Sequence, residues 1–231
     1  MKKFFPITLL TVTVCLFLSS GNAAAQWHIS ANAGADLNAH IVDNQFAYDY
    51  RYSPGWGYAF GVGAGYRFTD WFSLDAELDA VSKNFNMTRS GQDSGIFENQ
   101  SNLYLKIPVL ASFSFGGKRV RGFLNAGPYM GVQVFRKKTG STRGVTAGDP
   151  SAPEIYRYTI INDFSSKADN LFDAGATLGL GIGFLLTDKL GLGLEIRDYQ
   201  SFIGTKKSSS VVSTIDLNNT CAVLLSISYQ L

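Results

Sequence analysis

Apolar and polar residues alternate along much of this chain with a period of two. Such a period is typical of β-strands whose two faces meet different surroundings. In residues 71–84, for example, Leu74 and Leu78 alternate with Asp75, Glu77 and Asp79. Segments of this kind predict eight strands, with the approximate bounds 27–38, 57–69, 71–84, 102–115, 119–135, 171–187, 189–200 and 219–231. The chain is therefore predicted to be all-β.

A helical alternative fails in the longest apolar run beyond the N-terminal segment, residues 174–186. This run is interrupted by four glycines, Gly175, Gly179, Gly181 and Gly183. Each would destabilise a helix by about 1 kcal/mol relative to alanine, whereas in a strand all four share one face. The run is therefore predicted to be a strand. Pro128 removes a ladder hydrogen bond from the strand at 119–135, so we expect a bulge or local bend there.

Short and long connections between the predicted strands alternate strictly. The short turns are 69–70, 116–118 and 187–188, and the long polar segments are 39–56, 85–101, 136–170 and 201–218. Outer-membrane barrels have short periplasmic turns and longer extracellular loops. Eleven residues at ~3.3 Å each, tilted by ~45°, also cover roughly the 25 Å of an apolar membrane band. We predict a transmembrane, antiparallel, up-and-down β-barrel of about eight strands with both termini in the periplasm.

The N-terminal segment has the features of an export signal. Lys2 and Lys3 precede an apolar stretch at 4–18, and the small residues at 23–25 form a cleavage site. We predict a signal peptide at 1–25 and a barrel domain at 26–231, located in the bacterial outer membrane. Cys15 lies in the signal, which leaves Cys221 as the one mature cysteine and excludes an intrachain disulfide.

Composition narrows the choice of function. The 231 residues are 16% charged and 13% aromatic, with a formal net charge of +2. The low charged fraction and high aromatic fraction argue against a disordered chain, and the nearly neutral net charge does not indicate a nucleic-acid partner. Aromatic residues near the predicted strand ends suggest girdles at both membrane interfaces. We expect no cofactor and no metal site.

The direction of the two faces separates a membrane barrel from a soluble lipocalin-like barrel. A lipocalin has an apolar lumen and a polar exterior. Here one face carries bulky apolar groups, whereas the other mixes glycines, such as Gly61, Gly63 and Gly65, with charges. Small residues suit a crowded interior that is filled by long charged neighbours. We therefore expect the apolar face to meet lipid.

The predicted interior contains a set of charges that should pair across strands, because isolated buried charges are costly. The set is Arg67, Asp75, Glu77, Asp79, Lys106, Arg121, Glu195 and Arg197. An eight-stranded barrel is only wide enough for its own side chains, so we interpret the set as a plug; a narrow ion path is the alternative. Glycosidase chemistry at the three acids is disfavoured, since basic neighbours keep them ionised. No catalytic residue is assigned.

Basic residues of the long connections are candidates for contacts with lipopolysaccharide phosphates, with solvated loop bases as the alternative. They are Arg136, Lys137, Lys138, Lys206 and Lys207. His28, Ser30 and Asn32 distantly resemble the pattern of outer-membrane lipid A deacylases, which need His and Ser facing lipid. Ile29 and its alternate neighbours take the lipid face here, which disfavours this reading.

Several motifs from residue 102 onward carry a family resemblance. They are YLKIPVL at 104–110, LNAGPYMG at 124–131, LGLGIG at 178–183 and GLEIRDY at 193–199. With them the chain resembles the PorT-like family of bacterial outer-membrane β-barrel proteins. This resemblance implies a barrel rather than a reaction, although the family's namesake takes part in type IX secretion.

Three functions remain open from the sequence. The first is a non-enzymatic barrel with a structural or surface-interaction role through its long loops, in contact with outer-membrane lipid and lipopolysaccharide. The second is an accessory component of secretion or transport, which requires an envelope or secretion protein as partner. The third is a membrane-embedded lipid-modifying enzyme.

Overall fold

A computed structural model describes residues 26–43, 49–144, 154–164, 169–205 and 215–231. Its ten strands are β1 (Gln26–Asp43), β2 (Tyr50–Thr69), β3 (Phe72–Ser82), β4 (Phe85–Arg89), β5 (Phe97–Gly116), β6 (Val120–Gly144), β7 (Glu154–Ile161), β8 (Phe172–Leu185), β9 (Leu190–Ser201) and β10 (Ile215–Gln230). A short 3-10 helix spans Gly91–Asp93. The predicted signal peptide at 1–25 lies outside the described residues. None of the described helices is long and apolar enough to cross a membrane.

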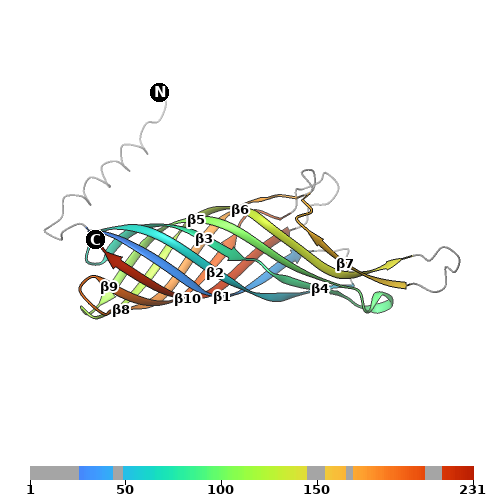
Figure 1. Cartoon of the computed structure of the whole chain (residues 1–231), viewed down its shortest axis with the longest axis horizontal. Helices are drawn as coiled ribbons and strands as arrows, with labels where there is room; N and C mark the ends of the chain where they lie inside the picture. The colour runs from blue at the N-terminus through green and yellow to red at the C-terminus, as the bar shows by residue number, and fades with distance from the viewer. Residues whose placement is uncertain (1–25, 44–48, 145–153, 165–168, 206–214) are drawn as a thin grey trace, which may run out of the picture.

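Eight of the strands close into a ring. β1 pairs with β2 on one side and with β10 on the other, and every pairing around the ring is antiparallel. The order around the ring is β1, β2, β3, β5, β6, β8, β9, β10. Closure leaves no unpaired strand edge within the ring, which is what a sheet needs in lipid. The predicted up-and-down barrel of eight strands is confirmed (Figure 1).

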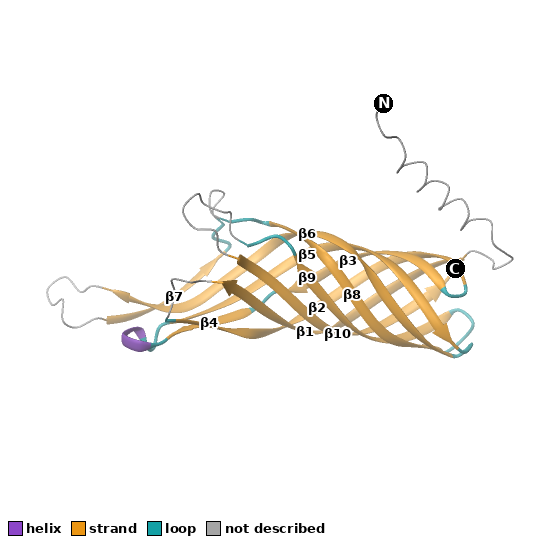
Figure 2. Ribbon diagram, turned by 180° about the vertical axis from the view of Figure 1, so that it is seen from behind, coloured by secondary structure: helices purple, strands orange, loops and turns teal. Residues whose placement is uncertain are grey.

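The two ends of the barrel differ in the way the sequence predicted. At one end the connections are short: β2 ends at Thr69 and β3 begins at Phe72, while β5 and β6 are separated by only 117–119. The C-terminus lies at this turn end (Figure 2). The opposite end carries the longer connections, and here the predicted strand bounds are wrong because the strands extend further.

This extension is a small sheet that projects beyond the ring. β4 pairs with residues 50–54 of β2 and with the start of β5, and β7 pairs with residues 137–144 of β6. β6 alone has 25 residues, far more than a membrane crossing requires. Backbone hydrogen bonds between strands form in water as well as in lipid, so segments without a lipid-facing apolar row still pair. Much of the predicted loops at 85–101 and 136–170 is therefore strand.

The irregularity expected at Pro128 lies elsewhere in β6. Pro108 pairs with Tyr129 and Ala111 with Ala126, so the β5–β6 register is the same on both sides of Pro128. The register shifts instead between Leu103 and Tyr104, whose partners Phe135 and Gln133 leave one residue of β6 unpaired. Pro128 is tolerated without a bulge there.

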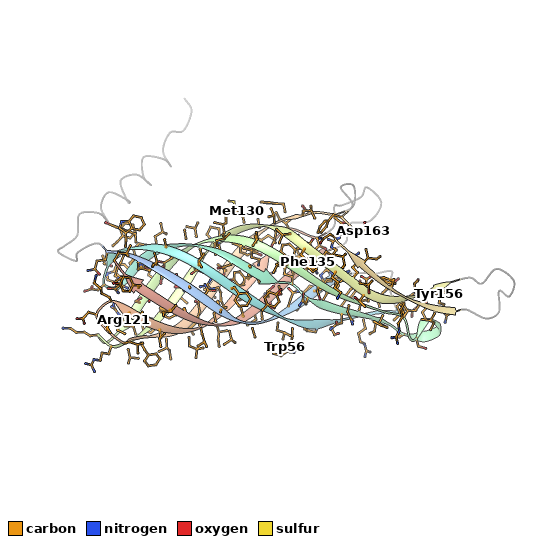
Figure 3. All side chains as sticks on the ribbon, in the orientation of Figure 1. Trp56, Arg121, Met130, Phe135, Tyr156 and Asp163 are labelled. Carbon is orange, nitrogen blue, oxygen red and sulfur yellow. The ribbon has the colours of Figure 1, made fainter. Side chains whose placement is uncertain are left out.

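The apolar face looks outward. Large apolar side chains such as Phe60, Leu180 and Leu225 are between 51% and 67% exposed, and the residues that alternate with them are buried and largely polar. Figure 3 shows Met130 and Trp56 projecting away from the barrel. This arrangement confirms the predicted polarity and excludes a lipocalin-like lumen. Phe85, at a strand end where the sequence predicts an aromatic of the outer girdle, is instead buried and stacks on His40 with ring centroids 4.1 Å apart.

Candidate functional site in the barrel interior

Interior glycines lie directly opposite acidic residues of the neighbouring strand. The β2–β3 register pairs Gly61 with Asp79, and Gly63 with Glu77. A Cβ atom on either glycine would overlap the side chain of its acidic partner. Across the barrel, a Cβ on Gly179 would overlap the carboxylate of Glu195. The glycines therefore provide the space in which the carboxylates lie flat against the barrel wall.

Arg197 is the centre of the interior charge network. Its Nε and Nη2 atoms donate to the two carboxylate oxygens of Glu195, each at 2.8 Å. Its Nη1 and Nη2 atoms also donate to Glu77, at 2.6 and 3.2 Å. Asp79 lies 3.4 Å from Nη1 and accepts a hydrogen bond from Tyr199 at 2.8 Å. The Arg197 side chain, 2% exposed, thus joins acids from opposite walls, β3 and β9.

A second cluster fills the barrel nearer the extension. Lys83 Nζ lies 2.7 Å from Asp173 and 2.6 Å from the Ser201 hydroxyl. Lys106 Nζ is fully buried, 3.9 Å from the same carboxylate of Asp173 and 4.2 Å from the ring centroid of Tyr129. Lys106 belongs to the predicted interior set, whereas Lys83 and Asp173 do not. Sequence reasoning missed Lys83 because it lies where the period of two breaks, between β3 and β4.

The predicted lipopolysaccharide contact at Arg136 is wrong. Its side chain points inward and is 4% exposed. It forms an ion pair with Asp169 at 3.0 Å and donates to Gln133 Oε1 at 2.9 Å. Arg136 lies two residues beyond the unpaired residue of β6, and a single extra residue exchanges the two faces of a strand. Lys137 is exposed and Lys138 half-buried, while the lysines at 206–207 lie outside the described residues.

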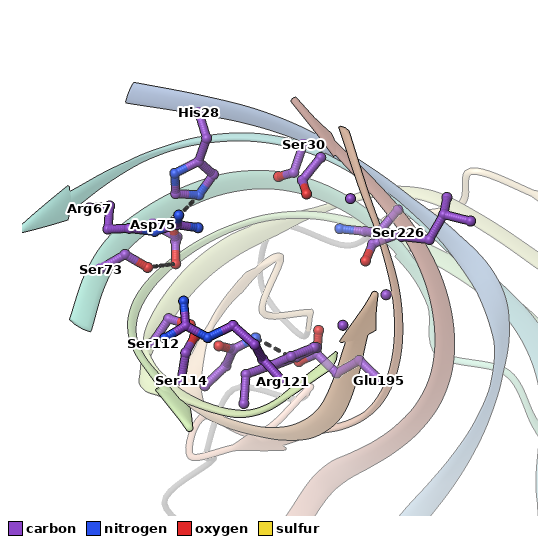
Figure 4. A pocket seen from close by; sticks show the side chains of 18 of the residues that line it. His28, Ser30, Arg67, Ser73, Asp75, Ser112, Ser114, Arg121, Glu195 and Ser226 are labelled. Carbon is purple, nitrogen blue, oxygen red and sulfur yellow. Dashed lines mark hydrogen bonds and ion pairs between the residues drawn. The ribbon is translucent and has the colours of Figure 1, made fainter. Parts of the chain in front are cut away.

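The remaining members of the predicted set line a cavity of about 180 Å³ at the turn end. Asp75 accepts from the Ser73 hydroxyl at 3.0 Å and lies 2.8 Å from His28 Nε2. Arg67 on β2 and Arg121 on β6 also line this cavity (Figure 4). The eight predicted interior residues therefore separate into three groups: one around Arg197, one that contains Lys106, and one at the turn end.

The interior geometry bears on the enzymatic alternative. His28 and Ser30 face the cavity rather than lipid, and Ile29 between them is exposed on the outer face. A membrane lipid cannot reach these two side chains from the lipid side of the barrel wall. Among the described residues, no group of three or more His, Cys, Asp or Glu side chains is arranged to hold a metal ion.

A closed antiparallel ring with an apolar exterior and a charged interior defines a membrane-spanning β-barrel. The chain belongs to the family described as outer membrane protein beta-barrel domain, whose profile matches residues 21–207. It is accordingly a protein of the bacterial outer membrane. No match was found among curated protein sequences.

Solved outer-membrane barrels are similar to this chain at low identity. Neisserial surface protein A is 13% identical, with a TM-score of 0.47, and the match covers 90% of this chain and 99% of that one. OprG from Pseudomonas aeruginosa is 10% identical, with a TM-score of 0.46 and coverages of 88% and 95%. The attachment invasion locus protein Ail of Yersinia pestis, solved with the heparin analogue sucrose octasulfate, is 10% identical, with a TM-score of 0.43 and coverages of 89% and 99%.

Proposed function

We propose that this protein is a non-enzymatic outer-membrane barrel that binds a protein outside the cell through its sheet extension. The observation that carries the proposal is the edge of β7. Within the described residues this strand pairs only with β6, so its other edge presents free backbone donors and acceptors. Figures 1 and 2 show β7 at the far end of the molecule from the turns.

Side chains of β7 support a partner strand as the occupant of this edge. Ile155, Tyr156, Ile160 and Ile161 are all exposed. Long exposed apolar edge strands pair readily with an added strand, and alternate side chains then supply specificity. Natural edges that avoid pairing carry charges or proline, whereas the single charge among residues 155–161 is Arg157. We therefore propose an extended segment of a partner protein as the ligand.

The extension is held rigidly enough to act as a docking platform. Tyr158 on β7 reaches across β6 at Gly140 and donates a hydrogen bond of 2.6 Å to Glu98 on β5. A Cβ on Gly140 would lie 2.8 Å from the tyrosine hydroxyl, so glycine is needed for this crossing. Burial and the bond to Glu98 both raise the pKa of Tyr158, which keeps the phenol protonated as a donor.

We also propose that the interior charges act as a plug rather than an ion path. The clusters around Arg197 and Lys83 span the barrel from wall to wall with buried side chains. For a solute to pass, several charge-assisted hydrogen bonds in a low-dielectric interior must break together. Under this proposal the barrel is a scaffold for the extension.

Site-specific photo-crosslinking in intact cells tests the surface role. A photoreactive residue at Ile155 or Ile160 should capture one defined protein, whereas the same residue at the lipid-facing Leu225 should capture lipid alone. An Ile155→Glu, Ile160→Glu double variant should reach the outer membrane normally and lose that partner. Capture of no protein at β7, or equal capture by the double variant, would overturn the proposal.

A PorT-like accessory role in secretion is the second candidate, and the turn-end cavity favours it because a polar chamber there faces the periplasm. A crosslinker at Lys118, in the turn between β5 and β6, distinguishes it from the surface role. Stoichiometric capture of a secretion component at Lys118, without capture at β7, would favour secretion.

A lipid-modifying activity is disfavoured by the inward direction of His28 and Ser30. An unchanged lipid A mass spectrum after overexpression would reject it.

Contacts of Lys137 and Lys138 with lipopolysaccharide phosphates remain part of the proposal. Lipopolysaccharide in the outer leaflet should then raise the unfolding temperature of the wild-type barrel more than that of a Lys137→Gln, Lys138→Gln variant. Equal stabilisation of the two proteins would remove this contact.

A further inference from the structure

The cavity at the turn end is lined by hydroxyl groups and by three arginines: Arg67, Arg121 and, deeper in the barrel, Arg197, whose acidic partners are described above. Arg67 is two residues from the end of β2, and Arg121 is the second residue of β6, so both lie near the mouth. Serines from β1, β3, β5 and β10 line the same cavity: Ser30, Ser73, Ser112, Ser114, Ser226 and Ser228. Figure 4 shows Arg67 and Arg121 reaching into the cavity from different strands, with serines around them.

Acidic residues of the cavity are occupied by other partners. Asp75 is held by His28 and Ser73, as described above. Glu77 and Glu195 are held deeper in the barrel by Arg197. Within the part of the chain that the structure describes, neither Arg67 nor Arg121 has a carboxylate within the 4.0 Å of an ion pair. Asp75 and Asp70 act on Arg67 only at longer range, so the two cations at the mouth have no direct ionic partner.

Hydrogen bonds satisfy the two guanidinium groups only in part. Arg67 donates from Nη1 and Nη2 to the side-chain amide oxygen of Gln230, at 2.7 and 3.2 Å, with that amide oriented to give both of its atoms a partner. The Nε atom of Arg121 is buried and has no hydrogen-bond partner. A buried donor without a partner is destabilising, and two like charges in one narrow mouth repel each other. An anion bound between the two arginines supplies the missing hydrogen-bond acceptor and offsets the repulsion between the two positive charges.

We propose that this cavity binds a phosphate group presented from the periplasmic side, as a phosphate ester or as the headgroup of an inner-leaflet phospholipid. The planar fork of arginine matches phosphate oxygens in a bidentate manner, and serine hydroxyls complete such a shell. The volume of about 180 Å³ is below the ~300–1,000 Å³ of pockets for drug-sized ligands, which favours a single small group. This site lies at the opposite end of the barrel from β7 and does not depend on the proposed surface role.

Calorimetric titration of the full barrel in a non-ionic detergent tests the site with inorganic phosphate and glycerol 3-phosphate as probes. Wild-type protein should bind one phosphate group saturably. Arg67→Gln and Arg121→Gln should each weaken binding by about tenfold or more, since each removes charge-assisted hydrogen bonds. Lys118→Gln is the matched control: it removes one positive charge from the same end, but Lys118 is exposed in the turn and does not line the cavity.

Reconstitution distinguishes the two sources of phosphate. The titration with glycerol 3-phosphate is repeated in lipid discs of phosphatidylglycerol. If the site holds a phospholipid headgroup, the lipid already occupies it and added glycerol 3-phosphate gives no binding signal. If the site takes a soluble phosphate ester, glycerol 3-phosphate still binds. Heat-modifiable migration in detergent gels checks that each variant is folded. Absence of saturable binding in detergent would overturn the proposal. Equal losses in Lys118→Gln and in the two arginine variants would also overturn it, since they would indicate nonspecific attraction.

Discussion

Replacing Arg197 with methionine removes the cation around which the interior network is built. The guanidinium makes four hydrogen bonds of 3.2 Å or less, two to Glu195 and two to Glu77. All three side chains are less than 10% exposed, so water cannot replace the lost partner. Methionine preserves much of the side-chain volume, so the change isolates the charge.

The expected loss follows from the cost of leaving buried charges without a partner. Removal of one member of a buried ion pair destabilises proteins by about 3–5 kcal/mol. With a denaturant dependence of about 1–3 kcal/mol per molar urea, the unfolding midpoint should fall by roughly 1 M or more. Two glutamates and Asp79 depend on Arg197, so the upper part of the energy range is expected.

Urea unfolding in detergent micelles, followed by tryptophan fluorescence and by heat-modifiable migration, measures this loss. The control variant combines Arg197→Met with Glu77→Gln and Glu195→Gln, which also removes two of the three acidic charges that Arg197 had paired; the third, Asp79, keeps its hydrogen bond from Tyr199. This control should regain most of the lost stability, because replacing a buried ion network with uncharged groups is often nearly neutral. The reasoning is refuted if the single variant loses less than about 1 kcal/mol, or if the control is no more stable than the single variant.

Three further predictions concern the exterior, the extension and the lumen. Leu225→Lys, on the lipid face, should destabilise the barrel in bilayers by about 2–4 kcal/mol, and no change in bilayer unfolding would contradict the assigned face. Gly140→Val should break the Tyr158–Glu98 hydrogen bond and speed hydrogen exchange in β7, with the β8–β9 amides as an unaffected internal control. Planar-bilayer recording of the wild-type protein should show little conductance, and large steady channels would contradict a plugged lumen.

Glycines illustrate what could be predicted and what could not. Their spacing at Gly61 and Gly63 indicated one face of a strand, and their mixture with charges indicated a crowded interior. Which acid faces which glycine depends on the β2–β3 register, which pairs Gly61 with Asp79 and Gly63 with Glu77. Register is a property of two strands, and a slip by one residue would turn every side chain to the other face.

Basic residues show the same division between local and non-local information. Arg197 was predicted to lie inside because strand β9 alternates cleanly, but its partner Glu77 is 120 residues away and became visible only through ring closure. Arg136 was predicted to be at the surface, and the single unpaired residue of β6 turned it inward to Asp169. β7 was assigned to a long loop although its sequence is rich in isoleucine and tyrosine, because its pairing with the distant end of β6 is visible only in the structure.

By itself, the sequence determined the class of fold, the number of strands in the closed ring, the alternation of short and long connections and the outward direction of the apolar face. These features follow from local periodicity, because each residue of a membrane strand meets either lipid or lumen independently of its distant partners. The tertiary structure alone decided the register, the partners of the buried charges, the free edge of β7 and the paired arginines of the turn-end cavity. Each of these depends on pairings between residues far apart in the chain, and such pairings leave no local pattern to read.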